Sequence, residues 1–130
     1  MANILVITHG NLAAEFVKIA ETITNRKGKA IPVCFDLDTD SDCSQKINSA
    51  IDSLDSGQSV IILTDLFGGT PSNMAIPFIQ KNKVEVITGL NLPMLLFLLT
   101  QPEDKDFEEL CRGAKQASQE SIIIAGEFLH

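Results

Sequence analysis

The sequence is poor in basic residues, with 10 Lys and Arg against 17 Asp and Glu and a formal net charge of −7. Binding to a nucleic-acid backbone needs a clustered surface of Lys and Arg that releases counterions. The shortage of such residues argues against DNA or RNA as a partner. The acidity would suit docking on a basic protein face, but it is also an ordinary means of staying soluble, so it identifies no partner by itself.

Cysteine is scarce as well. The three cysteines form no C-x-x-C pair and have no histidine at the spacing of a metal site; they are Cys34, Cys43 and Cys111. We interpret all three as reduced thiols of the core. The sequence predicts no metal site and no cofactor.

Long apolar runs are missing. The longest stretch, residues 92–99, is interrupted by Pro93 and is far shorter than the ~20 residues of a membrane-spanning helix. The sequence begins Met1-Ala2-Asn3 and enters an apolar run without a basic region or cleavage site. We therefore expect a cytoplasmic location and no insertion into a membrane.

The composition is that of a folded globular domain, with 45% apolar and 21% charged residues. A chain of 130 residues lies within the usual range for one domain. We expect residues 1–130 to form a single domain.

Short apolar runs of strand length alternate with segments of helical periodicity. The expected strands are residues 4–7, 30–35, 60–63 and 84–89, with 121–124 as a possible last strand. Pro32 cannot donate to a ladder, so the second strand is expected at an edge. In the first helix one apolar face is expected to be buried, namely Leu12, Phe16, Ile19, Ala20 and Ile23. The alternation predicts an α/β fold, a flavodoxin-like three-layer sandwich with a parallel sheet of order 2-1-3-4.

Two polar residues follow the first and third expected strands, His9 and Asp65. Neighbouring strands lie ~4.8 Å apart, and ligands of such sheets bind beyond the carboxyl ends where the strand order reverses. A carboxylate that accepts the Nδ1 proton of a histidine fixes its tautomer, presents Nε2 and stabilises a cationic product. We therefore predict that Asp65 orients His9 as a nucleophile. Taken alone, His9 would more often be an inert hydrogen-bonding residue and Asp65 a turn residue.

A glycine-rich segment follows Asp65. Its residues Gly68 and Gly69 allow a phosphate to approach the backbone closely, and Thr70 adds a hydroxyl at the start of a helix opened by Pro71. No Lys follows the glycines and no G-x-G-x-x-G occurs, so nucleotide binding is disfavoured. The candidate phosphate-binding residues are Thr8, Gly10, Gly68, Gly69 and Thr70.

Other polar residues have simpler alternatives. Asn91 and Met94 are either a helix cap and a core residue or part of the site lining. The aspartates of residues 36–42 lack the glycine and distal Glu of a calcium loop, so we expect a solvated loop. His130 is expected to be an exposed terminus.

Three motifs together resemble the IIA domains (EIIA) of mannose-type bacterial sugar phosphotransferase systems, the mannose/fructose/sorbose class. They are Thr8-His9-Gly10, Asp65-Leu66-Phe67-Gly68-Gly69-Thr70-Pro71-Ser72-Asn73 and Gly89-Leu90-Asn91-Leu92-Pro93-Met94-Leu95. The resemblance implies a phosphotransferase in which His9 is phosphorylated by the phosphohistidine of the carrier HPr. The group would pass to a histidine of EIIB, for sugar uptake through membrane EIIC and EIID components.

The resemblance also assigns roles to single residues. Asp65 would be the hydrogen-bond partner of His9, and Gly68, Gly69 and Thr70 the phosphate loop. The nearby supports would be Asn73, Asn91 and Met94. Family members are typically homodimers in which the last strand adds antiparallel to the partner's sheet, a part that residues 121–124 could play.

The sequence departs from the family at Ser72, where many relatives have an aromatic residue. Two alternative functions stay open. One is a regulatory module whose phosphohistidine reports sugar or energy supply. The other is the phosphotransfer subunit of a dihydroxyacetone kinase, a family that shares the fold and an early histidine but usually lacks the Gly-Gly-Thr-Pro and Asn-Leu-Pro-Met segments.

Overall fold

The computed structural model describes residues 2–35, 43–53 and 58–129. Its centre is a parallel sheet in the order β2-β1-β3-β4. The strands are β1 (Ala2–His9), β2 (Ala30–Phe35), β3 (Ser59–Thr64) and β4 (Val84–Thr88). The predicted α/β fold and strand order are confirmed. So is the edge position of β2, which contains Pro32 and pairs with β1 alone.

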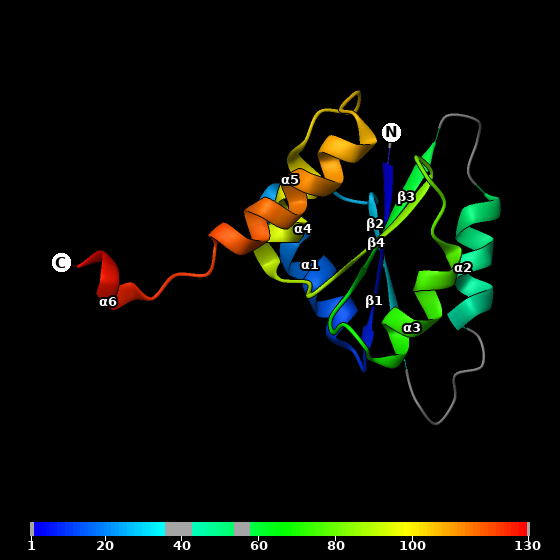
Figure 1. The fold of residues 1–130 in the computed structure, drawn as a ribbon, viewed down its shortest axis with the longest axis horizontal. Coiled ribbons are helices and arrows are strands. Elements are labelled where there is room, and N and C mark those ends of the chain that lie inside the picture. Colours follow the sequence, from blue (N-terminus) through cyan, green and yellow to red (C-terminus); the bar gives the residue numbers. More distant parts are fainter. Residues whose placement is uncertain (1, 36–42, 54–57, 130) are drawn as a thin grey trace.

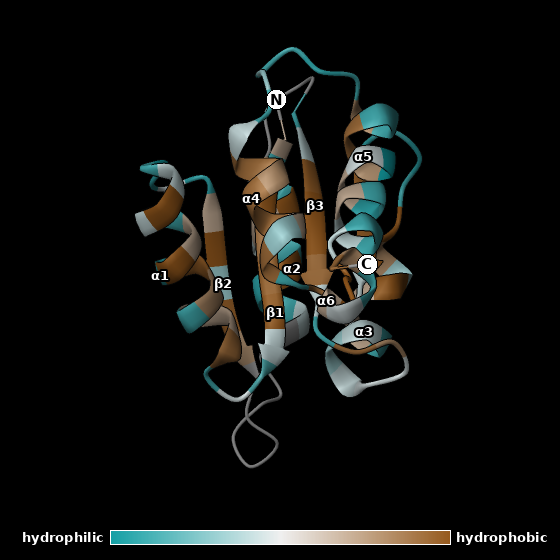
Figure 2. Ribbon diagram, turned by 90° about the vertical axis from the view of Figure 1, so that its left-hand side faces the viewer, coloured by the Kyte–Doolittle hydropathy of each residue, from teal (hydrophilic) through white to brown (hydrophobic). Residues whose placement is uncertain are grey.

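Helices cover both faces of the sheet (Figure 1). On one face lie α1 (Leu12–Thr24), α4 (Leu92–Thr100) and α5 (Phe107–Glu120); on the other lie α2 (Cys43–Asp52), α3 (Thr70–Ala75) and the short 3-10 helix η1 (Ile76–Phe78). Each face of the sheet forms its own hydrophobic core with the helices that cover it. Because side chains of a strand alternate between faces, Ile61 and Leu63 of β3 pack in the core under α1, α4 and α5, and Val60 and Ile62 pack in the core under α2 and α3. Figure 2 shows the strongly apolar α4 between α1 and α5, in front of the strands.

Two helices begin at residues whose side chains cap them. The Asn91 side chain accepts a hydrogen bond from the Met94 backbone N–H at 3.0 Å and starts α4. The Asp106 side chain accepts one from the Glu109 N–H at 3.2 Å and starts α5. The cap role predicted for Asn91 is confirmed, and each cap satisfies one of the N–H groups that a helix leaves unpaired at its beginning.

The start of α3 differs by one residue from the prediction. Gly69 is the N-cap and Thr70 the first helical residue, with Pro71 in the first turn as expected. The α-helix ends at Ala75 and continues as η1, which contains Pro77. Proline has no backbone N–H to donate to the carbonyl four residues earlier, so the α-helical ladder stops there.

The prediction of the buried face of α1 is right for Ala20, which is buried, and for Phe16, which packs against the core, and wrong for the other three residues. The buried residues are Ala13, Val17 and Ala20, whereas Leu12, Ile19 and Ile23 are 44%, 45% and 58% exposed. Two apolar stripes of helical period run along this helix, and the one with the smaller side chains faces α4 and the sheet. Small side chains let a helix approach its neighbours closely, and this decides the orientation.

The expected strand over residues 121–124 does not form in the single chain. These residues leave α5 and lead to a short helix, α6 (Ala125–Phe128), which lies away from the sheet (Figure 1). A strand needs a neighbouring backbone to pair with, and among the residues that the structure describes this segment pairs with no strand. Ile122, Ile123 and Ile124 are 78%, 55% and 67% exposed.

The cysteines are free thiols wherever the structure describes their side chains. Cys34 and Cys111 are unpaired and half-buried rather than fully buried. Burial raises the pKa of the Cys111 thiol to about 12, and the carboxylates of Glu85 and Glu108 add to the shift. Cys111 is therefore a neutral, unreactive thiol at physiological pH. The side chain of Cys43, residues 36–42 and His130 lie outside the described residues.

Membrane-spanning helices and metal clusters are both absent from the described residues. None of the helices there combines the length and the apolar character needed to cross a membrane. The same residues contain no cluster of three or more His, Cys, Asp or Glu side chains that could hold a metal ion.

Candidate functional site

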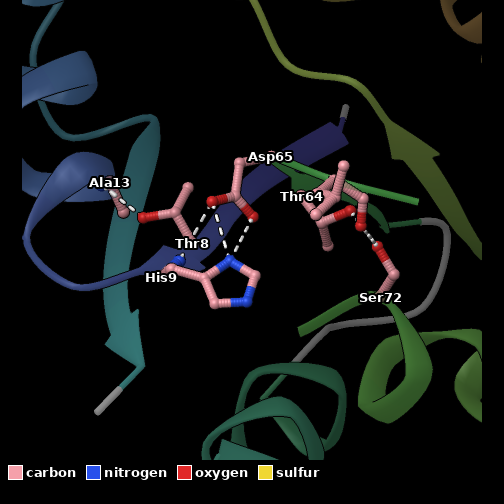
Figure 3. A network of polar contacts seen from close by, with 7 residues as sticks. Thr8, His9, Ala13, Thr64, Asp65 and Ser72 are labelled. Atoms are coloured by element: carbon pink, nitrogen blue, oxygen red, sulfur yellow. Dashed lines mark hydrogen bonds and ion pairs between the residues drawn. The ribbon is translucent and has the colours of Figure 1, made fainter. Parts of the chain in front are cut away.

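His9 and Asp65 meet at the carboxyl edge of the sheet, as the adjacency of β1 and β3 predicts. In the ladder Ile7 stands opposite Thr64, so the residues after them leave the sheet side by side. The Asp65 carboxylate contacts Nδ1 of His9 with Oδ2 at 3.0 Å and Oδ1 at 3.2 Å. Its Oδ2 also accepts a hydrogen bond from the His9 backbone N–H at 3.1 Å. One carboxylate thus holds both the ring and the main chain of His9 (Figure 3).

This contact determines the tautomer of the ring. A carboxylate only accepts hydrogen bonds, so Nδ1 of His9 carries the proton and Nε2 carries the lone pair of the neutral imidazole. Figure 3 shows Nε2 on the side of the ring away from Asp65. The side chains of His9 and Asp65 are 41% and 15% exposed. The orienting carboxylate is thus largely covered, while the ring remains accessible to a partner.

Thr8 shapes the chain just before the site. Its side chain is fully buried, and its Oγ1 accepts a hydrogen bond from the Ala13 N–H at 2.6 Å. The contact ties the end of β1 to the first turn of α1. Gly10 lies exposed in the connection between them.

The glycine-rich segment lies against the His9 ring. Gly68 has a φ of +85°, in the left-handed region that favours glycine. A Cβ on Gly69 would lie 2.9 Å from Cε1 and 3.4 Å from Nε2 of His9. The backbone can approach the ring this closely only because Gly69 has no side chain. Thr70, the first residue of α3, is half-buried beside it.

We expect Gly69→Ala to slow any reaction at His9 by about tenfold, because the new methyl group would turn the ring away from Asp65. The backbone of Gly69 is extended, with φ −78° and ψ 166°, so alanine causes no backbone strain. The measurement is the rate of His9 modification together with Tm. Gly126→Ala is the matched control, since a Cβ there meets nothing within 4 Å. Equal rates in both variants would contradict the close approach.

The three predicted supporting residues occupy different places. Asn73 is exposed, and its Nδ2 donates to the Gly68 carbonyl at 3.4 Å across the glycine-rich loop. Asn91 caps α4, and its Nδ2 donates to the Ser118 carbonyl at 3.2 Å, which links α4 to the end of α5. Met94 is buried in the core. The cap and core placements match the simpler readings of Asn91 and Met94.

The sequence does not predict a contact between two buried hydroxyl groups near the site, those of Thr64 and Ser72. Thr64 Oγ1 and Ser72 Oγ lie 2.6 Å apart, and Ser72 Oγ donates to the Leu66 carbonyl at 2.5 Å. Thr64 is the last residue of the fully buried β3, so its position does indicate a hydroxyl that must find a partner. Nothing in the sequence identifies that partner as Ser72.

An open hollow lies between β4 and α5. It has a volume of about 530 Å³ and is lined by residues that include Ile87, Asn91, Met94 and Ile122, and His9 is not among them. The reactive nitrogen is thus offered at the protein surface and not inside this hollow. Such placement suits a reaction with a group carried by another macromolecule.

Comparisons with known proteins show what the chain is similar to. Residues 3–115 match the family described as PTS system fructose IIA component. The chain is 34% identical over 86 residues to the fructose-specific EIIA component of the PTS system of Bacillus subtilis (strain 168). This alignment covers 65% of this chain and 59% of that protein. It is 30% identical over 122 residues to the mannose-specific EIIAB component of the PTS system of Escherichia coli (strain K12). This alignment covers 92% of this chain and 38% of that protein.

The fold is shared with a solved structure. The crystal structure of the phosphotransferase system component EIIA from Streptococcus agalactiae superposes with a TM-score of 0.86 at 23% identity, covering 98% of this chain and 99% of that one. The match therefore extends over nearly all of both chains.

Proposed function

Because the chain belongs to the family of PTS system fructose IIA components, we propose that it is a phosphocarrier whose His9 accepts a phosphoryl group from phospho-HPr. His9 then transfers the group to a histidine of an EIIB component. EIIC and EIID membrane components would take part only indirectly, through EIIB, and residues 1–130 would act as a single EIIA domain.

The proposal rests on the hydrogen bonds between Asp65 and His9. The carboxylate holds the ring at Nδ1 and the backbone at N–H. A histidine that transfers a group must expose one nitrogen with a lone pair and tolerate a positive charge after it reacts. The arrangement provides both, because Asp65 leaves the lone pair on Nε2 and its negative charge faces the ring.

The proposed step is balanced without a metal or a nucleotide. Nε2 of neutral His9 attacks the phosphorus of the phosphohistidine on HPr. The N–P bond of the donor breaks as the new N–P bond forms. The donor ring, whose other nitrogen carries a proton, takes back the electron pair and departs as a neutral imidazole. The His9 ring becomes cationic and keeps its proton on Nδ1, which donates it in a hydrogen bond to the Asp65 carboxylate. In the second step a histidine of EIIB attacks the phosphorus in the same way, and His9 departs as the neutral ring.

The glycine-rich loop is the proposed site for the phosphoryl oxygens. Gly69 lies against the ring edge that includes Cε1 and Nε2, so a group on Nε2 would lie beside Gly68, Gly69 and Thr70. Backbone and hydroxyl donors placed at a developing negative charge stabilise it in the transition state. Thr8 and Gly10 would contribute from the facing loop. The Thr8 hydroxyl already accepts a hydrogen bond from the Ala13 N–H. We therefore propose that Thr8 contributes by fixing the conformation of that loop.

We also propose a homodimer. The strand β4 lies at the edge of the sheet, and the neighbouring hollow is lined by Ile122. The isoleucines of residues 122–124 are exposed in the single chain. Pairing of this segment with β4 of a second copy would give its backbone a hydrogen-bonding partner and bury apolar side chains.

The proposal is tested by following the phosphoryl group. Incubation with labelled phosphoenolpyruvate, enzyme I and HPr is expected to label the chain, and omission of HPr to prevent labelling. The isolated, labelled chain is then mixed with a mannose-type EIIB domain, to which the label should pass. A chain that takes up no label would refute the acceptor role. Label that never leaves for EIIB would contradict the relay and favour the regulatory alternative.

A further inference from the structure

Two hydroxyls form a directed chain of hydrogen bonds beneath the site. Thr64 Oγ1 and Ser72 Oγ are 2.6 Å apart (Figure 3), and Ser72 Oγ donates to the Leu66 carbonyl at 2.5 Å. A serine hydroxyl has one proton, and the carbonyl has none to give. Thr64 must therefore donate to Ser72. The bonds run in one direction, from β3 through α3 to the turn after β3.

Both hydroxyls are cut off from water. Thr64 and Ser72 are each 0% exposed. In a buried site a polar group without a partner is costly, and a hydrogen bond cannot be replaced by one to solvent. The buried Ser72 hydroxyl thus holds the Leu66 carbonyl on one side of the turn.

The turn held by Ser72 is the one that carries the site. The Leu66 carbonyl also accepts a hydrogen bond from the Gly69 N–H at 3.3 Å, so the turn is fixed from two sides. Asp65 directly precedes Leu66, and Gly69 lies against the ring of His9. A shift of Leu66 would displace the orienting carboxylate and the loop beside Nε2 together.

We propose that Ser72 is a positioning residue for phosphoryl transfer at His9. By holding the Leu66 carbonyl, its hydroxyl keeps the Asp65 carboxylate on Nδ1 and the Gly69 backbone against the ring. The inference rests on the proposed function of His9. Ser72 acts through the turn and not on the phosphoryl group.

Ser72→Ala is expected to slow transfer from phospho-HPr by about tenfold, the effect of losing a group that orients a reactive side chain. It also leaves the buried Thr64 hydroxyl without its acceptor, so Tm should fall. Adding Thr64→Val removes that orphaned hydroxyl. The double variant should therefore regain Tm but not the transfer rate, because the Leu66 carbonyl still lacks Ser72.

Ser53→Ala is the matched control. The Ser53 hydroxyl also donates to a backbone carbonyl, that of Ala50 at 2.8 Å, but it follows α2 and lies exposed at the opposite edge of the sheet from His9. Loss of this bond should leave transfer unchanged. The comparison separates the loss of a serine hydrogen bond from the loss of the one that holds the turn.

The deciding readout is the ¹⁵N NMR signature of the His9 ring in the unphosphorylated protein. The wild type should show the Nδ1–H tautomer, and Ser72→Ala and the double variant a shift toward a tautomer mixture. An unchanged tautomer and rate in Ser72→Ala would overturn the proposal, as would recovery of transfer together with Tm in the double variant. A wild type that accepts no phosphoryl group would refute the proposed function instead, and the NMR comparison would still decide whether Ser72 controls the His9 ring.

Discussion

His9→Ala is expected to abolish labelling of the chain by phosphoenolpyruvate, enzyme I and HPr, a loss of more than about a thousandfold, because the variant lacks the nucleophile. The fold should survive, since the His9 side chain is 41% exposed and substitutions at such positions cost little stability. Label incorporation and thermal unfolding are measured on the same samples.

The sequence offers a matched control for this variant. It contains two histidines, His9 and His130. His130→Ala should be labelled as fast as the wild type. Labelling of His9→Ala at the wild-type rate, or its loss in His130→Ala, would show that His9 is not the acceptor.

Asp65→Ala is expected to slow phosphoryl transfer by about a hundredfold while His9 can still be labelled in the end. The substitution removes both contacts to Nδ1 and the one to the His9 N–H. The ring can then adopt the other tautomer, which protonates Nε2, and the cationic product loses its counter-charge. The measurement is a single-turnover rate with phospho-HPr in excess.

Asp104→Ala serves as the control for Asp65→Ala. Asp104 is exposed in the connection between α4 and α5, at the edge of the sheet opposite the site. It changes the net charge of the chain by the same amount, so it tests whether general electrostatics explains the loss. If the two variants transfer at one rate, Asp65 has no orienting role.

The part of the site that lies at strand ends could be predicted from the sequence. Apolar runs that stop at His9 and Asp65 place both residues at the same edge of a parallel sheet, and the strand order then brings them together. The glycine pair of Gly68 and Gly69 signals a close approach of the backbone. These predictions depend on the topology alone, which the alternation of strands and helices determines.

Other features depend on tertiary contacts that no sequence pattern records. The α1 stripes that contain Leu12 and Ala13 have the same helical period, and only the close packing against α4 selects the second. The bond from Ser72 to the Leu66 carbonyl depends on the shape of a turn. Residues 121–124 carry a strand pattern, but a strand forms only where another backbone is within reach.

We expect Nε2 of His9 to carry the phosphoryl group while Nδ1 stays bound to Asp65. The most direct test is NMR of the phosphorylated chain labelled with ¹⁵N-histidine, which shows the nitrogen that bears the phosphorus. We expect coupling of ³¹P to Nε2 of His9 and a proton retained on Nδ1. A phosphoryl group on Nδ1 of His9, on Asp65 or on His130 would contradict it.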